Sequence, residues 1–112
     1  MRSEITIGDE TVEMAASAAT PFLYQKIFRE DLLRSMQTDP ENVNNYIKLA
    51  FVMAKQADTP TTDMMKGAVT EEDFFVWLDQ FEMLDLMGAT ADVLQIYQSS
   101  RKGTSVPKQK AD

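Results

Sequence analysis

The chain of 112 residues is long enough for one folded domain, and its 44% hydrophobic and 26% charged residues are typical of a globular protein. It contains neither cysteine nor histidine, which excludes disulfides, thiolate metal sites and histidine-based acid–base catalysis. Residues 1–100 hold seven Lys/Arg and seventeen Asp/Glu, a formal charge of −10, so we expect no direct binding to nucleic acid.

The sequence also gives an expectation for the cellular location. No apolar stretch is long enough to span a membrane. The first residues, MRSEITIGDETVE, lack the apolar region of a signal peptide. We therefore expect a cytoplasmic protein that does not bind a membrane.

The first predicted element is a β-hairpin over residues 4–14. Ile5 and Ile7 alternate with polar residues, and so do Val12 and Met14. A turn at residues 8–10 would pair Ile7 with Val12 and Ile5 with Met14, and would place all four side chains on one face. Since an isolated hairpin is marginally stable in water, this face should pack on the helices. The small residues 15–19 that follow are predicted to form a linker.

Residues 20–36 predict the first helix, with Thr20 as its N-cap and Pro21 at the first helical position. Its apolar arc is wide, so the helix should have neighbours on more than one side. The charged run at residues 29–31 leaves two alternatives open. Either the helix continues to Met36, or Asp31 caps a separate short helix over residues 32–37.

Asp39 and Pro40 predict the start of a second long helix, over residues 40–57, with Asp39 as its N-cap. Apolar residues recur along this segment at helical spacing, which favours a central helix, whereas Val52 lies on the opposite, polar face. Residues 58–67 are predicted to form a loop that contains Met64 and Met65. These two methionines either pack on the core or provide an adaptable contact for a partner.

Thr70 predicts the N-cap of a third long helix, over residues 71–87, with three acidic residues in its first turn. The main core stripe of this helix consists of Phe74, Trp77, Leu78, Phe81 and Leu84. A second apolar stripe on roughly the opposite side consists of Val76, Met83 and Met87. The second stripe predicts an oligomer or partner surface, unless the C-terminal helix covers it.

The same helix carries an acidic stripe formed by Asp79, Glu82 and Asp85. This stripe is either a solvated face or a dock for a basic segment. Gly88 predicts the end of the helix, and Thr90 would cap a last short helix over residues 91–99. Residues 101–112 are polar and basic, and we expect them to form a disordered tail. The predicted fold is one mainly α domain over residues 1–100, with about four helices and a short N-terminal β-hairpin.

The acidic clusters are the only candidates for catalytic or metal chemistry. Glu71, Glu72 and Asp73 are consecutive, so they point to different sides of a helix and lack the spaced oxygen ligands of a calcium loop. No serine lies in a nucleophile motif, and there is no glycine-rich phosphate loop. We therefore predict no enzyme activity, no cofactor and no metal. The candidate partner-binding residues are Met64, Met65, Val76, Met83, Met87, Asp79 and Glu82.

Residues 19–33, ATPFLYQKIFREDLL, resemble a segment of the tail assembly chaperones of long-tailed bacteriophages, especially those that infect Gram-positive bacteria. In that family a short β-rich start with an Ile/Val alternation leads into a segment of the type A/G-T-P…Y-K…F-G-x-D-L-L. The order of the later elements is also similar, over about residues 3–100. One departure is Arg29, where the family often has glycine, and it puts a tight turn after Phe28 in doubt.

The resemblance implies a phage or prophage morphogenesis protein that acts in the host cytoplasm and is absent from the mature virion. Such chaperones coat the long helical tape measure protein and keep it soluble until tail tube subunits polymerise around it, which makes the tail tube protein a second partner. A longer product often arises by ribosomal frameshifting near the end of the short frame. Together with the second apolar stripe, the resemblance leads us to expect a homo-oligomer.

Two other functions stay open. The acidic body permits a DNA mimic that inhibits a DNA-binding protein, although the apolar helices favour a packed core and a protein-binding surface. A structural protein that completes the phage tail or head is the other alternative, and it would remain in purified particles.

Overall fold

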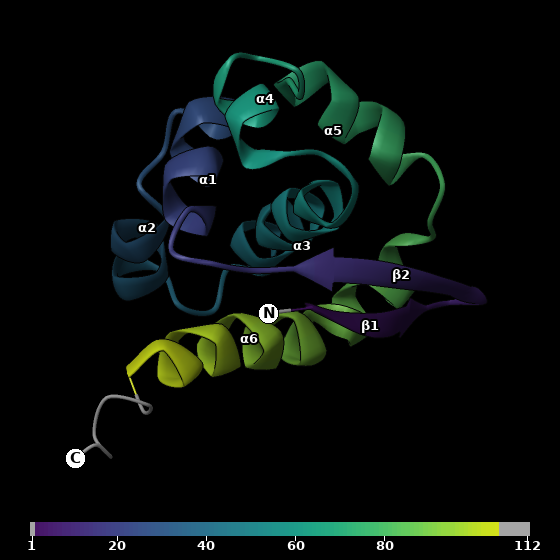
Figure 1. Cartoon of the computed structure of the whole chain (residues 1–112). Helices are drawn as coiled ribbons and strands as arrows, with labels where there is room; N and C mark the ends of the chain where they lie inside the picture. The colour runs from purple at the N-terminus through teal and green to yellow at the C-terminus, as the bar shows by residue number, and fades with distance from the viewer. Residues whose placement is uncertain (1, 106–112) are drawn as a thin grey trace.

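A central helix, α3 (Val43–Asp58), organises the fold in the computed structural model, which describes residues 2–105 and the side chains of residues 2–100 (Figure 1). Residues 49–53 of this helix are all buried. Because successive helical residues project about 100° apart, five buried residues in a row mean that α3 is covered on every side. Val52, which the sequence placed on a polar face, is therefore part of the core.

The other elements surround α3. β1 (Arg2–Ile7) and β2 (Glu10–Ala15) form the hairpin, and α1 (Thr20–Phe28) and α2 (Leu32–Thr38) follow. After α3 come α4 (Thr61–Met65), α5 (Glu71–Leu78) and α6 (Met83–Ser105). In Figure 1, α1 and α2 lie to one side of α3, α4 and α5 lie above it, and the hairpin and α6 lie below it. The predicted mainly α fold with an N-terminal hairpin is confirmed, although residues 2–105 form six helices instead of about four.

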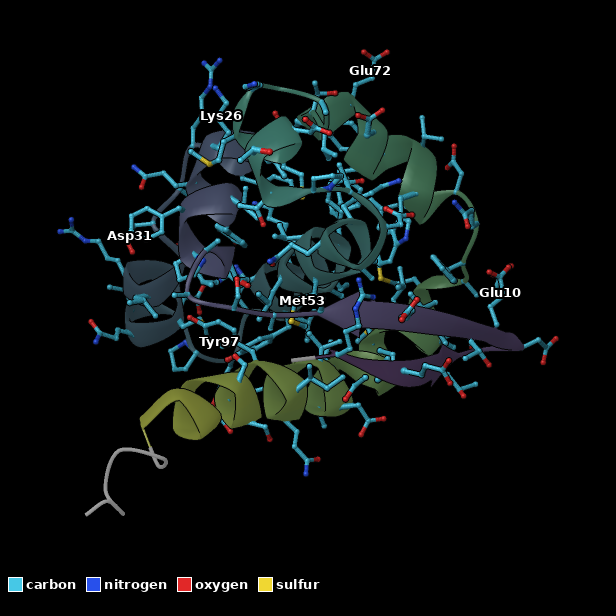
Figure 2. All side chains as sticks on the ribbon, in the orientation of Figure 1. Glu10, Lys26, Asp31, Met53, Glu72 and Tyr97 are labelled. Carbon is cyan, nitrogen blue, oxygen red and sulfur yellow. The ribbon has the colours of Figure 1, made fainter. Side chains whose placement is uncertain are left out.

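The side chains follow this arrangement. Figure 2 shows Met53 and Tyr97 in the region between α3 and α6, and both are buried. Glu10 and Glu72 point outward at the periphery of the same view. The core is therefore one cluster around α3, to which the hairpin, α1, α5 and α6 all contribute.

The hairpin has the predicted face but a different register. Ile5 pairs with Val12 and Ile7 pairs with Glu10, so the predicted pairing of Ile7 with Val12 is wrong by two residues. The reason is a two-residue turn at residues 8–9, in which Gly8 adopts a φ of 63°. A shift of two residues keeps the same face of each strand inward, so the apolar face still packs on the helices.

The turn of the hairpin lies against the first turn of α6. A Cβ atom at Gly8 would be 2.6 Å from Oδ2 of Asp85, so a side chain at this position would collide with that carboxylate. The backbone conformation is what requires glycine here, because the Asp85 side chain is exposed and its carboxylate can move away from a Cβ atom. The tip of the hairpin thus lies beside the start of α6.

Thr20 begins α1 but does not cap it. The N-cap is Ala19, and the Thr20 hydroxyl instead accepts a hydrogen bond from the Ser17 N–H and donates one to Gln56 Oε1. The predicted capping role is therefore wrong by one residue, because this hydroxyl is used to tie the start of α1 to α3. The predicted linker before it is confirmed for residues 16–19.

The break between α1 and α2 settles the two alternatives for residues 20–36 in favour of two helices. Arg29 adopts a left-handed φ of 59°, and its N–H donates to the Gln25 carbonyl at 2.7 Å. Asp31 caps α2, since its Oδ1 accepts from the Arg34 N–H at 3.0 Å. The tight turn after Phe28 is present even though no glycine occupies the turn.

We expect Arg29→Gly to raise the free energy of unfolding by about 1 kcal/mol, because a residue with a Cβ atom is strained at this positive φ. Thermal denaturation followed by circular dichroism should show a midpoint about 4 °C higher. Arg29→Ala is the control, since it removes the long side chain and keeps the Cβ atom. Equal midpoints for the two variants would show that the left-handed turn stores no strain.

Two segment boundaries in the middle of the chain differ from the prediction. α3 begins at Val43 instead of residue 40, because the N-cap is Asn42, whose Oδ1 accepts from the Asn44 N–H. Asp39 instead ends α2 and accepts a hydrogen bond from the Asn42 side chain. The predicted loop over residues 58–67 contains the short helix α4, which Met64 anchors in the core.

In the C-terminal half, the break between the last two helices lies at residues 79–82 instead of at the predicted Gly88. Thr70 caps α5 through a capping box with Asp73, as expected, but α5 ends at Leu78 instead of residue 87. The N–H groups of Gln80 and Phe81 bond three residues back, and the Glu82 carbonyl then accepts the first bonds of α6. A single helix over residues 71–105 would be about 50 Å long, twice the length of α3, and could not bury both of its halves against that helix.

α6 continues through Gly88 and Thr90, where the sequence predicted a break. Gly88 lies on the exposed side, and apolar residues on the core side, Leu86, Ala89 and Val93, hold the helix together across it. This packing outweighs the roughly 1 kcal/mol cost of a glycine in a helix. α6 extends to Ser105, five residues into the predicted disordered tail. Residues 106–112 lie outside the described residues.

Candidate interaction surface

The predicted partner-binding residues fall on three helices. Val76 is on α5 and is 63% exposed, while Met83 and Met87 are on α6 and are 54% and 42% exposed. Met65 is exposed on α4, whereas Met64 is completely buried. Met64 therefore follows the core alternative, and only its neighbour lies on the surface.

The second apolar stripe does not lie on one helix as predicted, because the break at residues 79–82 separates Val76 from the two methionines. The acidic stripe is divided by the same break. Asp79 is the C-cap of α5, Glu82 precedes α6, and Asp85 is in the first turn of α6. The C-terminal helix does not cover the stripe either, since it carries the two methionines itself.

On α5 and α6, two further large apolar side chains are exposed that the sequence had not marked as surface residues. Leu84 was expected in the core and is 79% exposed, and Phe75 is 57% exposed. Leu84 faces outward because α6 starts only at Met83, which changes the rotation of its residues relative to α5. A signal for Phe75 was present in the sequence: adjacent residues of one helix project about 100° apart, so Phe74 and Phe75 cannot both face the core centre.

An apolar line runs along the outer side of α6. We call it the α6 seam and define it by Leu84, Met87, Ala91 and Leu94, with spacings of three, four and three residues. The first three are exposed and Leu94 is half-buried. The core-facing residues of α6 are Leu86, Ala89, Val93, Ile96 and Tyr97. Counting about 100° per residue, the seam lies roughly opposite them, so it points away from the core.

The part of the chain that contains the α6 seam carries one sign of charge. Residues 67–100 contain seven Asp/Glu and no Lys/Arg. Within residues 2–100, the ion pairs are Arg2–Glu13 and Lys48–Glu30, so none of these seven carboxylates is paired with a cation there. An apolar seam on a body with this excess of carboxylates favours a partner that has apolar side chains and a basic surface.

Tyr24 is the one described group whose pKa clearly departs from its ordinary value. Burial, and then the nearby Glu30 carboxylate, raise the pKa of its phenol above 10. Its hydroxyl donates to Glu30 Oε1 at 3.5 Å, and both oxygens of Glu30 lie 3.2 Å from Lys48 Nζ. The phenol is completely enclosed by the core, so this arrangement connects α1 to α3 and offers no reactive group to a substrate.

This arrangement predicts a loss of stability in alkali. Above about pH 10 the unfolded chain releases the Tyr24 proton while the folded chain keeps it, so the free energy of unfolding should fall by about 1 kcal/mol per pH unit from this group. Urea unfolding between about pH 9 and 11 measures that slope. Tyr24→Phe removes the phenol and should show a shallower decline. If the free energy of unfolding falls equally with pH in the two proteins, the pKa of the Tyr24 phenol has its ordinary value.

The described residues provide little for bound ions or for a membrane. Among them, no group of three or more acidic side chains is placed to hold a metal ion. Over the same part of the chain, no helix combines the length and the apolar character needed to cross a bilayer. No family model, curated protein or solved structure matches this sequence.

Proposed function

We propose that this protein is a phage tail assembly chaperone that binds the tape measure protein and keeps it soluble during tail morphogenesis. The observation on which the proposal mainly rests is the α6 seam, an exposed apolar line on a strongly acidic body. The resemblance of residues 19–33 to such chaperones supports the same function, and it comes from a different part of the chain.

The spacing of the α6 seam suits a helical client. Apolar residues three and four positions apart form one line on a helix, which packs against a similar line on a second helix. Ala91 and the neighbouring Gly88 are small and exposed, so a client helix can approach the backbone of α6 closely. Met83 and Met87 have flexible side chains, which adapt to a client whose apolar residues vary along its length.

The charge of the protein explains how it would keep such a client in solution. A long helical protein with exposed apolar seams aggregates when those seams meet. A chaperone that covers a seam with α6 presents carboxylates at its outer surface, and coated clients then repel one another. Because the contact is narrow, it would be reversible when tail tube subunits replace the chaperone.

The remaining parts of the proposal follow from the same role. The protein would act in the host cytoplasm, form homo-oligomers along the client and be absent from the mature virion. It would be the short product of a frameshifted pair, and the tail tube protein would be a second partner that displaces it.

Co-expression with the longest helical reading frame encoded just downstream tests the proposal. We expect a larger soluble fraction of that partner when this protein is present, and co-purification of the two. If neither occurs, the chaperone function is wrong. Stable incorporation into purified particles would instead support a structural protein, and inhibition of a DNA-binding protein would support a DNA mimic.

A further inference from the structure

The outer edge of β1 has unused backbone hydrogen-bonding groups. In the two-stranded sheet, β1 pairs only with β2. Ile7 and Glu10 flank the two-residue turn, so they form a hydrogen-bonded pair, and in an antiparallel ladder such pairs alternate with non-bonded ones. The backbone groups of Glu4 and Thr6 therefore point away from β2, and none of them has a hydrogen-bond partner among the described residues.

A groove lies along this free edge. It has a volume of about 450 Å³ and is bounded by β1 on one side and by α6 on the other, which lie next to each other in Figure 1. The side chains from α6 are Asp92, Gln95, Ile96 and Ser99. Asp92, Gln95 and Ser99 recur at helical spacing, so they form a polar flank of α6 beside the edge of β1. A third strand added to β1 would lie over this flank.

The groove has a negative charge. Its two charged side chains are Glu4 and Asp92, and among the side chains of residues 2–100 no Lys or Arg lines it. Glu13, which lies opposite Glu4 in the hairpin, is already paired with Arg2 at 2.9 Å. Glu4 thus remains available, and the groove attracts a basic side chain.

This charge also disfavours a second copy of the chain in the groove. Antiparallel pairing of two β1 edges would bring Glu4 and Asp92 of one copy towards the same residues of the other. The groove at the free edge of β2 differs, because a cation, Lys55, lies in it beside the acidic residues Glu10, Glu13 and Asp58. The occupant that fits β1 is therefore an extended segment with basic side chains.

We propose that the edge of β1, from Ser3 to Thr6, binds an extended basic segment of a partner protein as a third strand. The backbone groups of Glu4 and Thr6 would pair with the segment, and Glu4 and Asp92 would bind its Lys or Arg side chains. This site is separate from the α6 seam and does not depend on the chaperone function.

The test uses an end-blocked peptide of alternating lysine and valine, whose binding is followed by fluorescence anisotropy. We expect saturable binding to the full-length protein, with slower hydrogen exchange at the amides of Glu4 and Thr6 by about tenfold. The same peptide with its β1-facing amides N-methylated keeps its charge and loses the hydrogen bonds, so it should bind about tenfold more weakly. A glutamate–valine peptide should not bind.

A matched pair of proline variants locates the edge. Thr6→Pro removes an outward N–H of β1 and leaves the hydrogen bonds to β2 intact, so it should weaken peptide binding by about tenfold. Thr11→Pro makes the same change directly opposite, at the free edge of β2, and should alter binding less than about twofold.

Several results would overturn the proposal. They are absence of saturable binding, equal affinity of the N-methylated peptide, or equal affinity of the two proline variants. A peptide-free dimer that Thr6→Pro dissociates would assign the edge to a second copy instead. If a proline variant does not fold, the comparison of the two peptides on the unmodified protein still decides the question.

Discussion

Phe51→Ala is expected to lower the free energy of unfolding by about 4 kcal/mol, the largest effect that we predict for a single substitution. Phe51 is completely buried at the centre of α3. Its ring lies 6.2 Å from that of Phe28, 5.3 Å from Phe74 and 5.6 Å from Trp77, each with an edge-to-face geometry. The substitution therefore removes contacts to α1 and α5 together and leaves a cavity where they meet α3.

Urea unfolding followed by far-ultraviolet circular dichroism measures this change. A loss of that size is a large part of the roughly 5–15 kcal/mol that stabilises a typical domain, so the variant should unfold well below the midpoint of the parent protein. Phe22→Ala is the matched control, since Phe22 is 66% exposed and its removal should change stability by less than about 0.5 kcal/mol. A comparable effect of the two substitutions would show that the aromatic cluster around α3 is not the centre of the core.

The elements that the sequence predicted best are those specified by nearby residues. Thr70 caps its helix as predicted, Asp31 caps α2 as one of the two alternatives allowed, and Gly8 makes the hairpin turn, each through contacts within a few residues. Such signals do not depend on the rest of the fold. The hairpin face could be predicted for the same reason, because a shift of two residues in register leaves the alternation of buried and exposed side chains unchanged.

The errors come from positions where distant contacts outweigh local preference. Gly88 is a common helix terminator, yet α6 continues through it because Ala89 and Val93 pack on the core on either side of the next turn. Thr20 is a common N-cap, yet its hydroxyl bonds to Gln56, 36 residues away. Val52 shares its side of the helix with polar residues, yet it is buried because other elements surround the middle of α3.

The sequence predicted part of the candidate surface correctly, but the reason for expecting that surface was partly wrong. Val76, Met83 and Met87 are exposed as expected, but they were assigned to one helix and lie on two. The prediction of exposure rested on the position of these residues roughly opposite the core stripe of a single helix, because a small domain cannot easily bury both sides of a helix. The position of Leu84 depended on where α6 begins, and the chain has no glycine or proline between residues 79 and 82 to mark that break.

Replacing Met83 and Met87 together by aspartate is expected to abolish self-association and client binding while the helical content stays unchanged. Both side chains are largely exposed in the first two turns of α6, where added carboxylates interact favourably with the helix dipole. At an apolar contact, however, two desolvated carboxylates would weaken binding by about 100-fold or more. The loss should therefore appear in association and not in folding.

Size-exclusion chromatography with light scattering measures the oligomeric mass, and co-purification with the co-expressed helical partner measures client binding. The matched control is the pair Phe22→Asp and Leu33→Asp, which adds the same charge at exposed apolar sites, 66% and 43% exposed, on α1 and α2. Figure 1 shows these two helices on the opposite side of the molecule from the start of α6. If the α6 variant keeps its mass and its client, the α6 seam is not the binding surface. If both double variants lose their oligomeric mass and their client, added charge alone causes the loss. The contact surface would then extend beyond α6.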